Sequence, residues 1–231
     1  MGAPEIGSST AEEMEEKSSR RMYISVILNL VNFLLVVWSV GSMLVWRGTG
    51  NMQVSGSRAF MYFTVDSNVL CAIASLLIAG CQIRRKVTPG IFIFKYVGTT
   101  AVTVTLMTVL LFLGPVLGYG GMFSGINLFL HLICPLLAIG TLVFTDSTEK
   151  IRRGHVWLSI LPTFLYGIVY LYKVVCIGAE NGGWHDFYGF NINGLWYVSL
   201  VVMLLATGLL GWILRLLHNK ANGMINREKG R

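Results

Sequence analysis

The segment that decides the fold is residues 60–82, FMYFTVDSNVLCAIASLLIAGCQ. It is mainly apolar, and as a helix it is long enough to cross a hydrocarbon core of about 30 Å. Its small polar side chains recur at i, i+3, i+4, i+7 and i+11, the spacing of one helical face; they are Thr64, Ser67, Asn68, Cys71 and Ser75. The segment therefore predicts a membrane-spanning helix whose polar stripe faces other helices rather than lipid.

The rest of the chain repeats this apolar pattern. Segments of spanning length lie at about 22–46, 60–82, 91–117, 126–145, 155–177 and 194–218. Hydrophobic residues make up 54% of the chain and charged residues only 13%, about half the charged share that is usual in soluble domains. The alternating pattern of an outer-membrane barrel is absent. We predict an all-α, polytopic integral membrane protein, a six-helix bundle over residues 22–218, with a mobile tail at 1–21 and a basic tail at 219–231.

Basic residues predict the orientation of this bundle. They follow the second predicted helix (Arg84–Lys86), the fourth (Lys150–Arg153) and the sixth (219–231), whereas the loops 118–125 and 178–193 contain no Lys or Arg. Since positive loops stay on the cytoplasmic side, both termini are predicted to be cytoplasmic. The net charge of +7 is divided among short loops beside the membrane, where it contacts anionic lipid. No nucleic-acid partner is expected.

Two reactive side chains are predicted to share one level of the membrane. Entering from outside, the second helix carries Thr64 roughly 6 Å deep, and the fourth carries His131 about 7 Å deep. A threonine hydroxyl attacks an ester only when a base such as imidazole takes its proton. Thr64 and His131 are therefore the candidate catalytic pair, and neighbouring groups would orient the base or stabilise an oxyanion; the candidates are Asp66, Ser67 and Asn68.

These residues also have structural interpretations. Thr64 can bond a backbone carbonyl within its own helix, and His131 can be a neutral histidine bonded to a neighbouring helix. Asp66 is costly in hydrocarbon unless it is paired, and Lys173 is the expected partner. Lys95 is expected to extend its amine to the cytoplasmic surface. In addition, Pro135 can kink the fourth helix.

The outer loops are rich in glycine and aromatic residues. GYGGMFSG (118–125) is expected to be flexible, and the loop at 179–194 carries a candidate lid or substrate contact or, alternatively, an aromatic belt at headgroup level; its candidate residues are Trp184, His185, Asp186 and Tyr188. The cysteine and histidine spacings match neither a metal signature nor a disulfide framework, so we expect no metal and no cofactor.

The motifs YFTVDSN (62–68) and NLFLHLICP (127–135), with the six predicted helices, resemble the androgen-induced membrane protein family. Its animal members are intramembrane threonine hydrolases of fatty acid esters of hydroxy fatty acids. The resemblance implies a nucleophile at Thr64 and a base at His131, which is followed by Pro135. Within that family, this chain most resembles bacterial six-helix members of unassigned function. The resemblance therefore implies that the protein resides in a bacterial plasma membrane.

The leading hypothesis is an intramembrane lipid ester hydrolase whose substrate, a membrane lipid or fatty-acyl ester, reacts just below the outer headgroups. The alternative is a non-enzymatic binding or transport protein, in which the same polar residues line a ligand cavity or a proton path. A structural subunit of a membrane complex is a third possibility. The oligomeric state stays open.

Overall fold

A computed structural model describes residues 6–45, 56–147 and 149–228. Within these residues, six helical segments are long and apolar enough to cross a membrane, as the sequence predicts, and none of these residues forms a strand. The helices are α1 (Ile6–Val45), α2 (Phe63–Ile83), α3 (Pro89–Thr108), α4 (Gly114–Leu117), α5 (Tyr119–Met122), α6 (Ile126–Leu128), α7 (Cys134–Phe144), α8 (His155–Leu171) and α9 (Trp196–Glu228). Short 3₁₀ or π segments complete them: η1 (Gly56–Met61), η2 (Val109–Leu113), η3 (Phe129–Ile133), η4 (Tyr172–Ile177), η5 (Ala179–Asn181) and η6 (Ile192–Gly194).

The first and last helices extend beyond the predicted spans. Residues 6–21, expected to belong to a mobile tail, form the start of α1, and α9 continues through the expected tail as far as Glu228. Both extensions add turns to an existing helix, so neither bears the cost of nucleation. Residues 11–17, AEEMEEK, are also strong helix formers. The remaining tail residues, 1–5 and 229–231, lie outside the described part of the chain.

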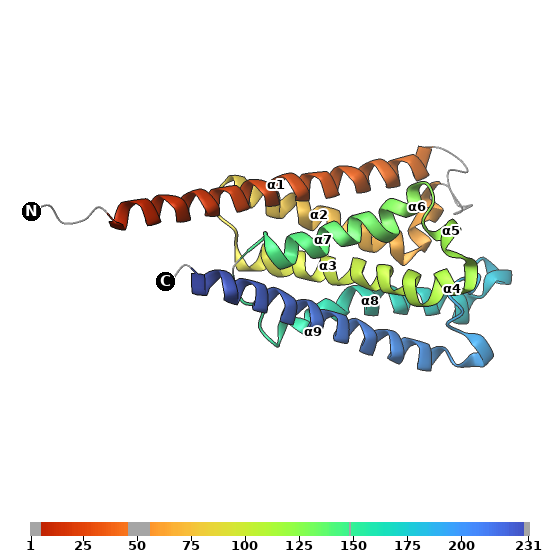
Figure 1. Ribbon diagram of the computed structural model, residues 1–231. Helices are drawn as coiled ribbons and strands as arrows, with labels where there is room; N and C mark the ends of the chain where they lie inside the picture. The colour runs from red at the N-terminus through yellow and green to blue at the C-terminus, as the bar shows by residue number, and fades with distance from the viewer. Residues whose placement is uncertain (1–5, 46–55, 148, 229–231) are drawn as a thin grey trace, which may run out of the picture.

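The helix α3 occupies the centre of the bundle and contacts α2, α7, α8 and α9. It approaches α2 closely at Gly98, where a Cβ atom would lie 3.0 Å from the Cα of Cys71. α1 begins and α9 ends at the same end of the bundle (Figure 1), which we call the terminal end. The opposite end, with residues 56–62, 118–125 and 178–195, is the loop end and corresponds to the predicted exterior.

The polar stripe of α2 faces the interior, as predicted: Thr64, Ser67, Asn68, Cys71 and Ser75 are all buried. The prediction for Lys95 was wrong. Its side chain is fully buried, its Nζ lies 3.9 Å from Asp146 Oδ2, and it donates hydrogen bonds to Asn29 Oδ1 (2.6 Å) and Ser75 Oγ (2.7 Å). An ion pair and two neutral acceptors replace the water that the ammonium would otherwise seek.

Two helical spans are interrupted by a π segment toward the loop end, at η2 and η3, and α8 ends in a third π segment, η4. Two of these segments come just before a proline, Pro115 or Pro135. Because proline has no N–H and its ring clashes with the carbonyl four residues earlier, a wider turn relieves the conflict. The kink expected at Pro135 therefore takes the form of a π turn in which the Cys134 N–H bonds the Phe129 carbonyl, and His131 lies within this turn.

Candidate functional site

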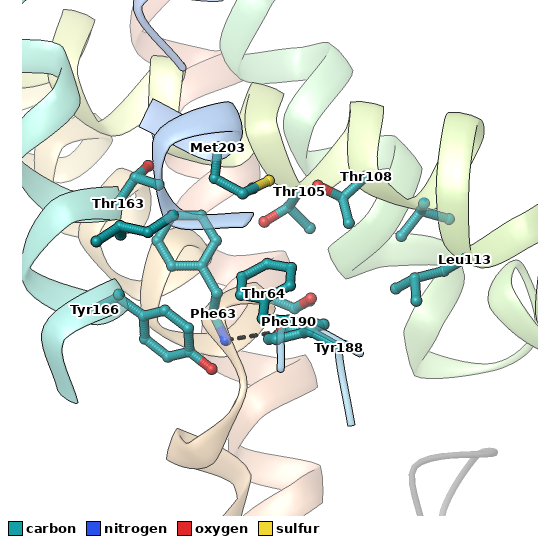
Figure 2. A pocket seen from close by; sticks show the side chains of 13 residues that line it. Phe63, Thr64, Thr105, Thr108, Leu113, Thr163, Tyr166, Tyr188, Phe190 and Met203 are labelled. Carbon is teal, nitrogen blue, oxygen red and sulfur yellow. Dashed lines mark hydrogen bonds between the residues drawn. The ribbon is translucent and has the colours of Figure 1, made fainter. Parts of the chain in front are cut away.

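Thr64 lies in the first turn of α2, at the loop end of the bundle, and its side chain is buried. It lines a cavity of about 40 Å³ between α2, α3, α8 and α9, large enough for a few water-sized groups but not for an acyl chain. The walls are mainly apolar, and the cavity-lining residues that carry hydroxyl groups are Thr64, Thr105, Thr108, Thr163, Tyr166 and Tyr188 (Figure 2).

Tyr188 covers this cavity from the loop between α8 and α9. Its Oη accepts the Phe63 N–H at 3.1 Å, beside Thr64 (Figure 2). Burial raises the pKa of the Tyr188 phenol, so the hydroxyl keeps its proton. The phenol oxygen accepts the Phe63 N–H, and the same hydroxyl, which lines the cavity together with Thr64, can also donate a hydrogen bond.

The loop that carries Tyr188 is folded around Asp186. One carboxylate oxygen accepts the Tyr170 hydroxyl and the Phe190 N–H, and the other accepts the Asn191 N–H, each at 2.8 Å. The Tyr188 N–H in turn donates to Tyr170 Oη at 3.0 Å. Asp186 is therefore a positioning residue for the loop rather than a substrate contact.

The other candidate lid residues lie elsewhere. His185 is exposed to solvent, and Trp184 lines a second cavity, described below, rather than the Thr64 cavity. Of the four residues that the sequence singled out in this loop, the structure brings only Tyr188 to Thr64.

We expect Asp186→Asn to loosen this loop, because the amide group would present a donor to the Asn191 N–H and the charge would be lost. Hydrogen bonds to charged groups contribute about 1.5–3 kcal/mol, so backbone amides of residues 186–195 should exchange with deuterium at least about tenfold faster. Hydrogen–deuterium exchange mass spectrometry measures this. Glu180→Gln, an exposed carboxylate of the same loop, is the matched control, and equal exchange in both variants would contradict the role of Asp186.

His131 is buried, with 2% of its surface exposed. Its Nδ1 lies 2.8 Å from the carbonyl oxygen of Met122. A carbonyl only accepts, so Nδ1 carries the proton and Nε2 has a free lone pair. This is the tautomer that a general base requires.

The Asn68 amide connects the two candidate catalytic segments. Its Nδ2 donates to the Thr64 carbonyl at 2.7 Å and to the Leu130 carbonyl at 2.9 Å. Thr64 and His131 therefore lie at a common level of the bundle, and both side chains are buried rather than turned toward lipid. Among the described residues no hydrogen bond joins the two, and His131 lines neither cavity described here.

The structure distinguishes the three groups proposed to assist catalysis. Ser67 Oγ bonds Thr105 Oγ1 at 2.8 Å and the Thr64 carbonyl at 3.2 Å. Asn68 uses its amide nitrogen for two carbonyls, so it is occupied as a donor. Tyr188 is a better candidate donor to an oxyanion than either, and its role depends on a loop conformation that the sequence alone does not reveal.

Asp66 points away from the Thr64 cavity into the second one, a groove of about 330 Å³ beside α2 and α8. The expected ion pair between Asp66 and Lys173 is not formed. Within the described residues, the only ion pair joins Lys95 and Asp146. In the same part of the chain, no group of three or more His, Cys, Asp or Glu side chains converges to hold a metal ion. The cysteines are unpaired: Cys71, Cys81, Cys134 and Cys176.

Comparisons of the chain with protein-family models, curated proteins and solved structures gave no match. The similarity in the Thr64 and His131 motifs to the androgen-induced membrane protein family stays a prediction.

Proposed function

We propose that this protein hydrolyses lipid esters within the membrane, with Thr64 as the nucleophile and His131 as the general base. The observation that carries the proposal is the Asn68 amide, which ties the Thr64 turn of α2 to the Leu130–His131 turn at one level. The Met122 carbonyl adds to it, because it fixes the His131 tautomer that can accept a proton.

The chemistry would follow two steps. His131 Nε2 takes the hydroxyl proton as Thr64 Oγ1 attacks the ester carbonyl carbon, and the Tyr188 hydroxyl donates to the developing oxyanion. The C–O bond of the ester breaks, His131 returns the proton to the leaving alcohol, and an acyl-threonine remains. Water, deprotonated by the same imidazole, then attacks the acyl carbon. The bond to Thr64 Oγ1 breaks, His131 returns the proton to Thr64 Oγ1, and the carboxylic acid is released. Thr64 and His131 must come within hydrogen-bond distance in the substrate complex, since catalytic contacts are often longer in the free enzyme.

The chemistry of the cavity favours a fatty-acyl ester over a polar substrate. Its walls are largely apolar and carry no charged residue, so binding would depend on apolar contact and on the position of the ester bond. Because the cavity of about 40 Å³ is too small for an acyl chain, substrate binding requires the Tyr188 loop to move.

We propose a plasma-membrane location, bacterial by the resemblance, with the loop end outside and both termini in the cytoplasm. The basic clusters Arg84–Lys86 and Lys150–Arg153 support this orientation, because they adjoin the ends of α2 and α7 and the start of α8, all at the terminal end (Figure 1).

A long-chain alkyl fluorophosphonate, which reacts with activated hydroxyls, tests the proposal on purified protein in nanodiscs. We expect labelling at Thr64, read by mass spectrometry, that is retained in Thr64→Ser and lost in both Thr64→Ala and His131→Ala. Thr108→Ala removes another hydroxyl from the same cavity and should label normally. An unlabelled wild type, or labelling that survives Thr64→Ala, would overturn the assignment.

A second candidate function, a proton or ligand path, is favoured by a polar chain through the bundle interior. Near the terminal end, Gln82 donates to Ser25 Oγ (2.8 Å), which bonds Asp146. Toward the loop end, Ser75 joins Lys95 to Asn32, and the stripe of α2 continues to Thr64. Proton flux into liposomes that is abolished both by Lys95→Met and by the double variant Lys95→Met with Asp146→Asn, whose stability is expected to recover, would favour this function over hydrolysis if the fluorophosphonate does not label the protein.

A further inference from the structure

The groove that contains Asp66 opens sideways, toward the surface that faces lipid. It lies between α2 and α8, with Trp184 of the outer loop at one side, and measures about 330 Å³, near the lower end of ligand pockets. Its outer wall includes Phe60, Leu165 and Val169, which are 41%, 60% and 48% exposed. Exposed apolar side chains on a spanning helix contact acyl chains, so a ligand reaches this groove from the bilayer.

Asp66 is the only carboxylate, and no Lys or Arg accompanies it in the groove lining. Among the described residues its side chain has neither an ion pair nor a hydrogen bond. The two hydroxyl groups of the groove are engaged elsewhere: the Tyr166 hydroxyl bonds the Met61 carbonyl at 2.6 Å, and Ser67 bonds Thr105. A partly buried carboxylate in hydrocarbon is costly without a counter-charge, and none of the described residues that line the groove supplies one.

Four aromatic rings line the same groove: Phe60, Phe63, Tyr166 and Trp184. The rings of Phe63 and Tyr166 are 5.1 Å apart at their centroids. Aromatic faces beside a carboxylate attract organic cations, above all quaternary ammonium groups. The apolar side chains of Leu70, Leu165 and Val169 suit an alkyl chain.

The lining argues against other ligand classes. A hard metal ion takes six or more oxygen ligands, whereas Asp66 and Ser67 provide the only polar side chains here besides Tyr166 and the Trp184 indole. A fatty acid anion would be repelled by Asp66. A zwitterionic phospholipid would bring a phosphate into a groove that contains no basic residue.

We propose that this groove binds a single-chain alkylammonium amphiphile, with Asp66 as the counter-ion, the aromatic rings around the ammonium head, and the chain along α8. The site is separate from the Thr64 cavity, since Phe63, Ser67 and Tyr166 form the wall between them. Its occupancy does not depend on the proposed hydrolysis.

A photoreactive dodecyltrimethylammonium that carries a diazirine in its chain tests the site on the full chain in nanodiscs. We expect saturable crosslinking to residues 60–70 and 162–169, competed by unlabelled dodecyltrimethylammonium. A dodecanoate with the same diazirine should crosslink at least tenfold less. This comparison uses the wild type alone, so it holds whether or not any variant folds.

Charge-specific variants then identify Asp66. Asp66→Asn should reduce the saturable crosslinking at least tenfold, Trp184→Leu about threefold or more, and Asp66→Glu should retain most of it. Glu180→Gln, which removes a charge outside the groove, should match the wild type. Equal crosslinking by the anionic probe, full crosslinking in Asp66→Asn, or equally effective competition by dihexanoylphosphatidylcholine would each overturn the proposal.

Discussion

Lys95→Met is expected to reduce the free energy of unfolding by about 3–5 kcal/mol, the usual effect of removing one partner from a buried ion pair. Lys95 and Asp146 are both fully buried in their side chains, so the variant leaves a carboxylate without its counter-charge. It also leaves Asn29 Oδ1 and Ser75 Oγ without the ammonium that bonds them.

A double variant that also neutralises Asp146 distinguishes two causes of this destabilisation, the unpaired charge and the altered packing. Asp146→Asn keeps an oxygen that can accept from Ser25 Oγ and Asn29 Nδ2, the bonds of 2.8 and 2.6 Å that now reach Asp146 Oδ1. The double variant Lys95→Met with Asp146→Asn should therefore recover much of the stability that Lys95→Met loses.

Steric trapping in bicelles measures these unfolding free energies. Lys86→Met, which removes an exposed lysine of the loop after α2, should stay within about 0.5 kcal/mol of the wild type. A Lys95→Met variant as stable as Lys86→Met would show that the pair contributes nothing to the fold.

The sequence predicts the spanning helices well because each is a local property of an apolar segment. The stripe of α2 was also predictable, since helical periodicity alone places Asn68, Cys71 and Ser75 on one face. Both kinds of prediction depend on neighbours within a few turns, and neither needs knowledge of the partner helix.

The polar pairings were not predictable in this way. Lys95 and Asp146 come together because α3 packs against α7 and contacts α1 through Asn29. No spacing of residues along the chain predicts this ion pair. The predicted pair of Asp66 and Lys173 does not form, because an expected position along a helix does not fix the rotation of that helix about its axis. The position of Tyr188 depends on Asp186 and its hydrogen bonds within the loop, a conformation that glycine-rich sequence leaves undetermined.

If Thr64 and His131 act as one catalytic unit, removing both is expected to cost no more than removing one. General-base catalysis contributes about 10²–10⁴-fold, so Thr64→Ala and His131→Ala should each reduce kcat for p-nitrophenyl octanoate hydrolysis by about this factor. The double variant should retain the same residual rate, because a base without its nucleophile, or the reverse, contributes nothing further.

Independent structural roles would give a different result. Thr64 and His131 are both buried, so each alanine would leave a separate defect, and effects of non-interacting sites add as free energies. The rate losses would then multiply in the double variant, and Thr108→Ala, at another hydroxyl of the same cavity, would show a loss of similar size to Thr64→Ala. If the rate losses multiply, the Asn68 amide has only a structural role: it joins two helical turns at the same level of the bundle, and Thr64 and His131 do not react together.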